Sequence, residues 1–224
     1  MDYHQALDLY CERTDPLFWS EPLNAISNGA FIVAAVVLLM RTRATRCVLP
    51  WDIAVLAGLI ALVGLGSFVF HTVATVWASL LDVLFIEIYI YVYFARFLQR
   101  VGGLSPVRMI IGLVLFALFE RLLTGMFVPG SLNGSYRYLP ALIVLAGMAL
   151  YALRARPALF APLGMAVIVF CISLGLRTID MAACAINPLG THFLWHLLNA
   201  LVLYCATVAL SRSVPARAHG VGPI

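Results

Sequence analysis

The sequence contains no lysine and few charged residues of any kind. Its 224 residues include 14 basic side chains, all of them arginine, and 10 acidic ones, so charged residues make up 11% of the chain. A soluble domain usually carries about 25% charged residues, and this chain therefore cannot cover a water-facing surface. The shortage excludes an ordinary cytosolic domain, and the net charge of +4 is too small and too scattered for a nucleic-acid-binding protein.

Apolar residues are abundant instead, at 63% of the chain with a mean hydropathy of +1.01. The core of a bilayer takes about 20 apolar residues per helix. Seven segments have this character: 22–40, 52–70, 76–99, 105–126, 138–153, 158–176 and 190–211. None alternates like a barrel strand, so helices are the remaining way to satisfy the backbone in lipid. The sequence predicts an all-α polytopic membrane protein with a seven-transmembrane-helix bundle at 22–211 and an acidic N-terminal segment at 1–21. A tail follows at 212–224, and we expect residues 213–224 of it to be disordered.

The arginines predict how the bundle is oriented. Ten of them flank the connections after the first, third and fifth segments or follow the seventh, including Arg46 and Arg217. Four fall on the other side: Arg13, Arg121, Arg137 and Arg177. The positive-inside rule then places the N-terminus outside and the C-terminus in the cytoplasm.

Ionisable side chains interrupt the apolar segments, where they are expensive to insert. His192 and His196 are four residues apart and share a helix face, as do Ser67 and His71. Asp82 lies in the first turns of the third segment. With the orientation given above, all five groups fall in one layer near the outer surface, which is not expected of unrelated polar residues.

This set suits a catalytic metal. A catalytic zinc typically has three protein ligands and keeps a fourth position for water, and His71, His192 and His196 can supply three neutral imidazoles. Asp82 could act as the base, and Ser67 could donate a hydrogen bond to a developing oxyanion. The alternative is a non-catalytic scaffold, because a membrane histidine often only hydrogen-bonds a neighbouring helix.

A second polar cluster precedes the first apolar segment and contains Asp8, Glu12, Asp15 and Glu21. Carboxylate oxygens there could bind Ca²⁺, but spacing alone favours a solvated segment with helix-capping acids. Cys11 and Cys184 both fall on the outer side, and an oxidising exterior permits a disulfide between them.

Several short motifs together resemble the alkaline ceramidase family. They are Tyr10-Cys11-Glu12, Glu21-Pro22 with Asn24 and Ser27-Asn28, Ser67-x-x-x-His71, Asp82 and His192-x-x-Trp195-His196. The resemblance runs in order from residue 10 to residue 199. That family belongs to a larger group of seven-span membrane hydrolases that includes the adiponectin and progestin receptors.

The resemblance implies a role for each matching residue. It makes His71, His192 and His196 zinc ligands, Asp82 the catalytic acid and base, and Ser67 a group that stabilises the oxyanion. It also implies a Cys11–Cys184 disulfide and a calcium site with Glu12, Glu21 and the backbone carbonyl of Tyr10 as ligands. Leu9 departs from the animal pattern, which has an aspartate calcium ligand there, so that Asp15 or Asp8 would have to compensate.

The expected function is a zinc-dependent hydrolase of linear amides that cleaves ceramide or a related N-acyl lipid drawn from the bilayer. The arginine-only, alanine-rich composition indicates a bacterial inner-membrane protein, and because many bacteria make little sphingolipid the substrate could be another N-acyl lipid or an ester. We expect no nucleic-acid or obligate protein partner. The alternatives are a seven-span receptor of the adiponectin and progestin type, which is expected to have the opposite orientation, and the scaffold described above.

Overall fold

The computed structural model describes residues 2–45 and 48–213, and these fold as a helical bundle. The helices are α1 Pro22–Ser27, α2 Gly29–Thr45, α3 Trp51–Val73, α4 Val76–Arg100, α5 Pro106–Gly125, the 3-10 helix η1 Ser131–Tyr138, α6 Leu139–Ala155, α7 Pro157–Ala183 and α8 His192–Arg212. Within the described residues, β structure is limited to one isolated bridge between Ala6 and Thr75. The all-α fold class is confirmed. Arg46, Arg217 and the part of the tail at 214–224 lie outside the described residues.

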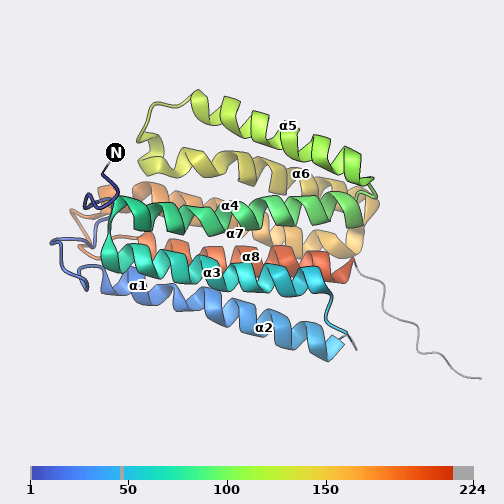
Figure 1. The fold of residues 1–224 in the computed structure, drawn as a ribbon, viewed down its shortest axis with the longest axis horizontal. Helices are drawn as coiled ribbons and strands as arrows, with labels where there is room; N and C mark the ends of the chain where they lie inside the picture. The colour runs from blue at the N-terminus through green and yellow to red at the C-terminus, as the bar shows by residue number, and fades with distance from the viewer. Residues whose placement is uncertain (1, 46–47, 214–224) are drawn as a thin grey trace, which may run out of the picture.

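Six segments of the described chain are helices long and apolar enough to cross a membrane. They are Pro22–Thr45, Trp51–Val73, Val76–Arg100, Ser131–Ala155, Pro157–Ala183 and His192–Arg212. The 20-residue helix α5 is different because it carries Arg108, Glu120 and Arg121 and buries only Phe116. It packs at the edge of the bundle against α4 and α6 (Figure 1). The count of seven spans therefore depends on α5.

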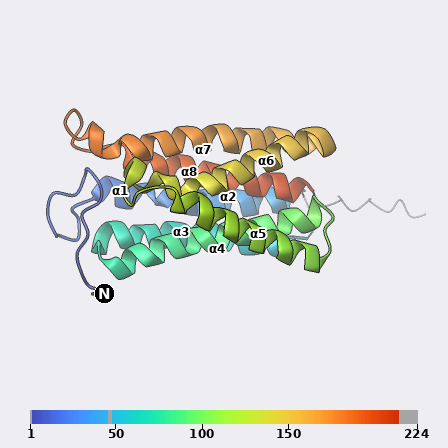
Figure 2. The ribbon, with the colours of Figure 1, turned by 90° about the horizontal axis from the view of Figure 1, so that it is seen from above.

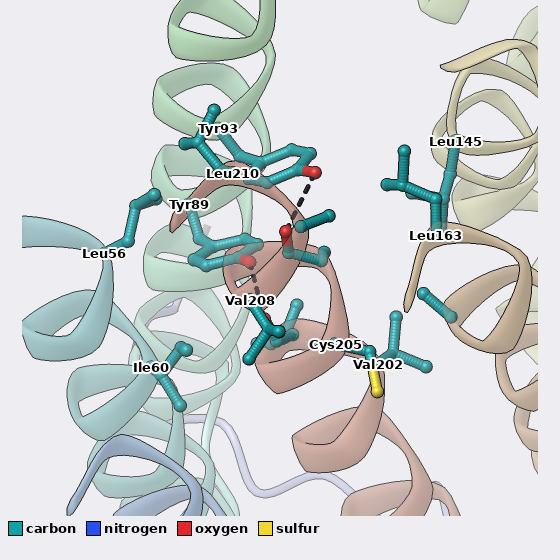
Figure 3. Packing of buried hydrophobic residues seen from close by; sticks show 14 of the residues in the cluster. Leu56, Ile60, Tyr89, Tyr93, Leu145, Leu163, Val202, Cys205, Val208 and Leu210 are labelled. Atoms are coloured by element: carbon teal, nitrogen blue, oxygen red, sulfur yellow. Dashed lines mark hydrogen bonds between the residues drawn. The ribbon is translucent and has the colours of Figure 1, made fainter. Parts of the chain in front are cut away.

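Helix α8 is the central helix and contacts α2, α3, α4 and α7. Two tyrosines of α4 connect to it inside the apolar core, as Figure 3 shows. The Tyr89 hydroxyl donates to the Leu203 carbonyl at 2.9 Å, and the Tyr93 hydroxyl donates to the Ala206 carbonyl at 3.0 Å. A buried phenol needs such a partner, so these bonds set the position of α4 against α8.

The close approach of α2 to α3 depends on Gly64. A Cβ atom at this position would lie 2.8 Å from the Cβ of Phe31 and 2.9 Å from the backbone oxygen of Asn28. Small residues let membrane helices come together in this way. The contact brings α1 and the start of α2 beside the end of α3 that carries His71.

Alternate connections between the long helices lie at one end of the bundle. The N-terminal segment, the α3–α4 turn, η1 and the α7–α8 loop gather there. The end of α2, the beginning of α3 and the α4–α5 and α6–α7 connections lie at the opposite end (Figures 1 and 2). We call the first of these the N-terminal end. Ser67, His71, Asp82, His192 and His196 all belong to helix turns at this end.

Candidate metal centre

Three histidines from two helices meet at the N-terminal end. His71 lies in the last turn of α3, and His192 and His196 occupy the first two turns of α8. One ring nitrogen of each lies within 4.8 Å of those of the other two, which makes this a group that can hold a metal ion. All three side chains are buried, with at most 2% of the residue surface exposed.

Hydrogen bonds leave nitrogen lone pairs free at this point. The Nδ1 atom of His71 lies 2.6 Å from Oε2 of Glu21, so it carries the proton and Nε2 keeps its lone pair. His196 Nδ1 lies 2.8 Å from the Ser27 hydroxyl, which itself donates to the Asn24 carbonyl. His196 is therefore the donor, and in this tautomer its Nε2 keeps its lone pair. Oxygen partners of this kind are what fixes the tautomer of metal-binding histidines.

Two of the ring nitrogens test whether a metal fits. Nε2 of His71 and Nδ1 of His192 are buried and have no hydrogen-bond partner among the described residues. Leaving a buried polar atom unpaired costs about 1–3 kcal/mol, and native proteins rarely accept that cost. The donor set, three neutral imidazoles, is one that zinc prefers. The residues therefore fit a metal ion.

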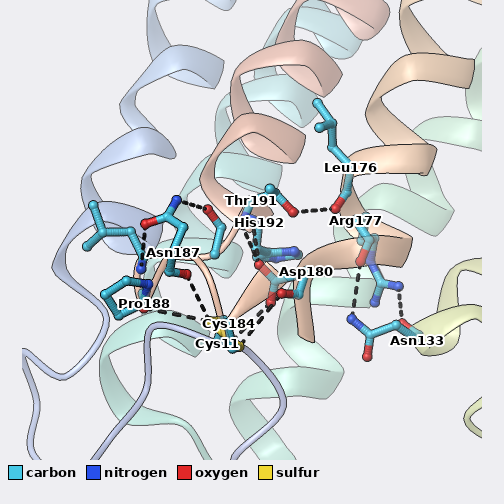
Figure 4. The surroundings of a disulfide bond; sticks show 12 residues. Cys11, Asn133, Leu176, Arg177, Asp180, Cys184, Asn187, Pro188, Thr191 and His192 are labelled. Atoms are coloured by element: carbon cyan, nitrogen blue, oxygen red, sulfur yellow. Dashed lines mark hydrogen bonds between the residues drawn. A yellow bond between two sulfur atoms is a disulfide. The ribbon is translucent and has the colours of Figure 1, made fainter. Parts of the chain in front are cut away.

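The beginning of α8 is held in place from outside the helix (Figure 4). The buried carboxylate of Asp180 accepts hydrogen bonds from the backbone N–H groups of Thr191 at 2.7 Å, His192 at 2.8 Å and Cys11 at 3.0 Å. The structure contains the Cys11–Cys184 disulfide, with 5.5 Å between the two Cα atoms. Both links tie the N-terminal segment to α7 and to the first ligand of α8.

Gly190 makes this arrangement possible. Its φ of +63° is in the left-handed region, and a Cβ atom here would collide with Oδ1 of Asp180 and with the Cβ of Cys11. Glycine has no Cβ and adopts positive φ without strain. The loop can therefore turn directly into α8 with His192 facing the centre.

Ser67 and Asp82 lie beside the histidines. Ser67 is buried on α3, one turn before His71. The carboxyl group of Asp82, on α4, interacts with the Ser67 hydroxyl and with the His71 ring. The structure thus brings together the five residues that the sequence places in one layer.

A comparison with known families bears on this geometry. The family model described as Ceramidase matches residues 10–217 of the chain. The chain belongs to the ceramidase family. A search of curated proteins finds no significant match. The resemblance drawn from the short motifs is thus confirmed at the level of the family, and membership of the ceramidase family implies a hydrolase acting on the amide bonds of lipids.

Tyr10 of this ceramidase-family chain lies against the first histidine of α8. Its ring stacks on His192, with 3.6 Å between the ring centroids and an interplanar angle of 18°. Its backbone carbonyl accepts a hydrogen bond from the N–H of Arg13 at 3.2 Å. Burial raises the pKa of the Tyr10 phenol, so the ring stays neutral against the imidazole.

Arg177 is a half-buried cation beside the centre, and the sequence did not reveal this position. Its guanidinium lies 5.3 Å from the Tyr138 ring centroid and 5.5 Å from that of Trp195. It donates to the Asn133 carbonyl at 2.6 Å and to the Tyr10 hydroxyl at 3.3 Å. Its one sequence signal is an arginine directly after the apolar segment 158–176, which the positive-inside argument treated only as a charge on the outer side.

Glu12 and Asp15 are engaged by backbone groups. The two carboxylate oxygens of Glu12 accept from the N–H groups of Leu23 at 2.7 Å and Asn24 at 2.8 Å, at the beginning of α1. Burial raises the pKa of Glu12, and these two hydrogen bonds offset only part of that effect. The exposed Asp15 accepts from the N–H of Leu17 at 2.8 Å. Glu12 therefore caps the beginning of α1, and the calcium ligands that the resemblance implies stay a prediction.

Glu21 is the carboxylate that reaches the histidines. Oε1 accepts from Nε of Arg13, and Oε2 accepts from Nδ2 of Asn24 at 3.0 Å as well as from His71. Burial alone would raise the pKa of Glu21, but the hydrogen bonds from His71, Asn24 and Arg13 outweigh it and lower the pKa. The group of metal-binding side chains found in the described residues does not include Asp8, Glu12, Asp15 or Glu21.

Proposed function

We propose that the chain is a zinc-dependent intramembrane amidohydrolase. It cleaves the N-acyl amide bond of ceramide or a related lipid to a fatty acid and a long-chain amine. The observation that carries the proposal is the buried group of His71, His192 and His196 beside Asp82 and Ser67. One ring nitrogen of each histidine lies within 4.8 Å of those of the other two. Membership of the ceramidase family supports the bond type.

The three histidines would hold the zinc ion. When bound at such a site, zinc acts as a Lewis acid toward the carbonyl oxygen and lowers the pKa of water to about 7. Glu21 and Ser27 keep His71 and His196 in the tautomer that this role needs.

Asp82 and Ser67 carry the chemistry of the protein itself. A carboxylate oxygen of Asp82 accepts a proton from the attacking water and transfers it to the nitrogen of the leaving amine as the C–N bond breaks. The hydroxyl of Ser67 donates to the oxygen on which negative charge develops. Water supplies the new C–O bond of the fatty acid.

An apolar cavity supports a lipid as the substrate. It lies between α4, α6, α7 and α8 and is lined by Ile86, Tyr89, Tyr93, Leu145, Phe170 and Asn199 among others. Asn199 lies one turn after His196 on α8, so the cavity approaches the candidate centre. The hydroxyls of Tyr89 and Tyr93 are already bonded to α8, which leaves an apolar wall suited to a hydrocarbon chain.

The proposed membrane arrangement has seven spans, with α5 as the fourth, in a bacterial inner membrane. Segment 1–21 and the active site then lie near the non-cytoplasmic face, domain 22–211 spans the bilayer and tail 212–224 is cytoplasmic. Two observations support it: α5 exposes large apolar side chains such as Ile110, Leu118 and Leu122, and arginines such as Arg41 and Arg212 lie at the end opposite the histidines.

Zinc quantification combined with mass spectrometry of lipid products tests the proposal. We expect purified wild-type protein to carry one zinc per chain and to release fatty acid and amine from N-acyl lipids. His196→Ala should lose both while remaining folded, and His4→Ala, which changes an exposed histidine, should keep both. Retention of zinc and near wild-type hydrolysis by His196→Ala would refute the assignment, and a parallel assay with acyl esters would show whether esters are the preferred substrates.

A further inference from the structure

Arg13, in the N-terminal segment, is buried together with its guanidinium group. Its Nε donates to Oε1 of Glu21. Its Nη1 donates to the carbonyl of Asp15 at 3.1 Å and more weakly to that of Leu17 at 3.5 Å. Its Nη2 donates to the carbonyl of His71 at 3.2 Å. Only 4% of the Arg13 side chain and 2% of the Glu21 side chain are exposed.

These acceptors are the kind of oxygen atoms that a calcium ion collects. Calcium takes six to eight oxygen ligands from carboxylates and backbone carbonyls. Here one carboxylate oxygen and three carbonyl oxygens surround a guanidinium instead. Both oxygens of Glu12, which the resemblance makes a calcium ligand, already accept hydrogen bonds from α1.

A calcium ion does not fit these residues. A divalent cation held by Glu21 would lie close to the fixed positive charge of Arg13, and such repulsion is strong where water is excluded. Leu9 provides no carboxylate that could replace these ligands, and this residue is 46% exposed.

We propose that Arg13 takes the place of the calcium ion that the resemblance implies and acts as a positioning residue for the metal centre. Its charge neutralises Glu21, and its donors hold the Asp15–Leu17 turn against the end of α3. Glu21 in turn fixes the His71 ring through Nδ1, so Arg13 acts on the ligand through one intermediate side chain. The protein therefore needs no calcium.

An arginine suits this position better than a lysine. The planar guanidinium directs its donors in fixed directions and stays charged when buried. It reaches Glu21 on one side and the carbonyls of Asp15 and His71 on the other. A single ammonium group cannot reach acceptors spread over the edge of a guanidinium.

Calcium binding tests the first part of the proposal and requires no activity. We expect purified full-length protein to contain no stoichiometric calcium and to show the same thermal midpoint in millimolar CaCl2 as in millimolar MgCl2. One calcium ion per chain, or a midpoint raised by CaCl2 but not by MgCl2, would overturn the replacement. Either result leaves the proposed hydrolase untouched, because the zinc content is measured separately on the same sample.

Zinc titration of variants tests the positioning role. We expect Arg13→Gln to weaken zinc binding about tenfold or more, which is the range seen when an outer partner of a metal ligand is lost. Arg96→Gln is the matched control, because Arg96 also pairs with a buried carboxylate but at the opposite end, and it should bind zinc like the wild type. Wild-type zinc affinity in Arg13→Gln would refute the role.

Arg13→Lys covers the case in which Arg13→Gln does not fold. Lysine keeps the positive charge but lacks the several fixed donors of a guanidinium. The zinc affinity of Arg13→Lys should therefore lie between those of the wild type and Arg13→Gln. If the lysine variant binds zinc as tightly as the wild type, charge alone suffices and the positioning role of the guanidinium is refuted. Zinc binding is read directly, so this test is independent of which lipid the protein hydrolyses.

Discussion

The two ends of the bundle both bury a carboxylate beside arginine, but the two networks finish differently. At the end opposite the histidines, Asp52 of α3 accepts from Nε of Arg96 at 2.8 Å and from Nη2 of Arg100 at 2.6 Å. Both of its oxygens are thus paired with arginine. At the N-terminal end the network continues from Arg13 through Glu21 to a histidine whose other nitrogen has no partner among the described residues.

This difference separates a structural network from a functional one. The Asp52 network pairs α3 with α4 and can be explained by packing alone. The Glu21 network orients a ring so that a lone pair faces two other imidazoles, and packing gives no reason to bury such an atom unpaired. Substitutions at the two ends should therefore differ in their effects on metal binding and on stability.

Removal of the metal should have the largest effect on activity, and this effect should depend only on residues at the N-terminal end. A strong zinc chelator should reduce lipid hydrolysis by about a thousandfold or more, because the metal supplies several kcal/mol of transition-state stabilisation. Added zinc should restore the rate. Zinc at about 1,000 times its dissociation constant should also raise the free energy of unfolding by about 4 kcal/mol, which thermal unfolding in detergent would detect.

Asp52→Asn provides the control for this experiment. Its response to chelator and to added zinc should match that of the wild type, because Asp52 lies at the other end of α3. Hydrolysis that survives complete removal of the metal would contradict the proposed function, and the two ends would then both be structural.

Asp52→Ala should have the next largest effect, on stability rather than on metal binding. Removing one partner of a buried ion pair costs about 3–5 kcal/mol, and the partly exposed side chains of Arg96 and Arg100 place the loss at the lower end of that range. The thermal midpoint should fall while the zinc content stays at one per chain. A variant with unchanged stability would show that the ion pairs of Asp52 make no net contribution to the free energy of unfolding.

Glu21→Gln should have a smaller effect on stability but a clear one on the metal. Loss of the carboxylate partner of a metal-binding histidine weakens metal affinity about 10- to 100-fold, and competition with a chelator of known affinity would measure it. The control is Glu12→Gln, because Glu12 caps α1 and does not contact a histidine in the described contacts. Equal zinc affinities in the two variants would show that the contact of Glu21 with His71 does not contribute to metal binding.

Local spacing accounts for the parts of the fold and site that the sequence predicts correctly. The helices follow from long apolar segments, and the His192/His196 and Ser67/His71 pairs follow from the four-residue period of a helix. The predicted depth of these residues in the membrane then grouped the side chains of separate helices. The family match adds support that spacing alone could not provide.

Contacts between distant segments explain what the sequence did not reveal. Arg13 reaches the carbonyl of His71, 58 residues away, and Ser27 reaches His196, 169 residues away. No regular spacing in the sequence connects Arg13 to His71 or Ser27 to His196. In the sequence Asp52 is one acid at the beginning of a helix, and only the packing of α4 shows that two arginines bind it. Helix α5 has too many charges for its composition alone to establish it as a membrane span.

Ser27→Ala should have the smallest effect on zinc affinity among the substitutions at the N-terminal end that weaken zinc binding. The variant removes the acceptor 2.8 Å from Nδ1 of His196, but the backbone of Asn24 also interacts with this ring and can accept in its place. Zinc affinity should therefore fall less than about tenfold, below the usual loss for an outer partner. Ser173→Ala, which removes a hydroxyl that donates to the Trp195 carbonyl, should cost about 1 kcal/mol of stability and leave zinc affinity unchanged. A larger loss of zinc affinity in Ser173→Ala than in Ser27→Ala would mean that packing of α8, rather than orientation of the imidazole, controls the metal.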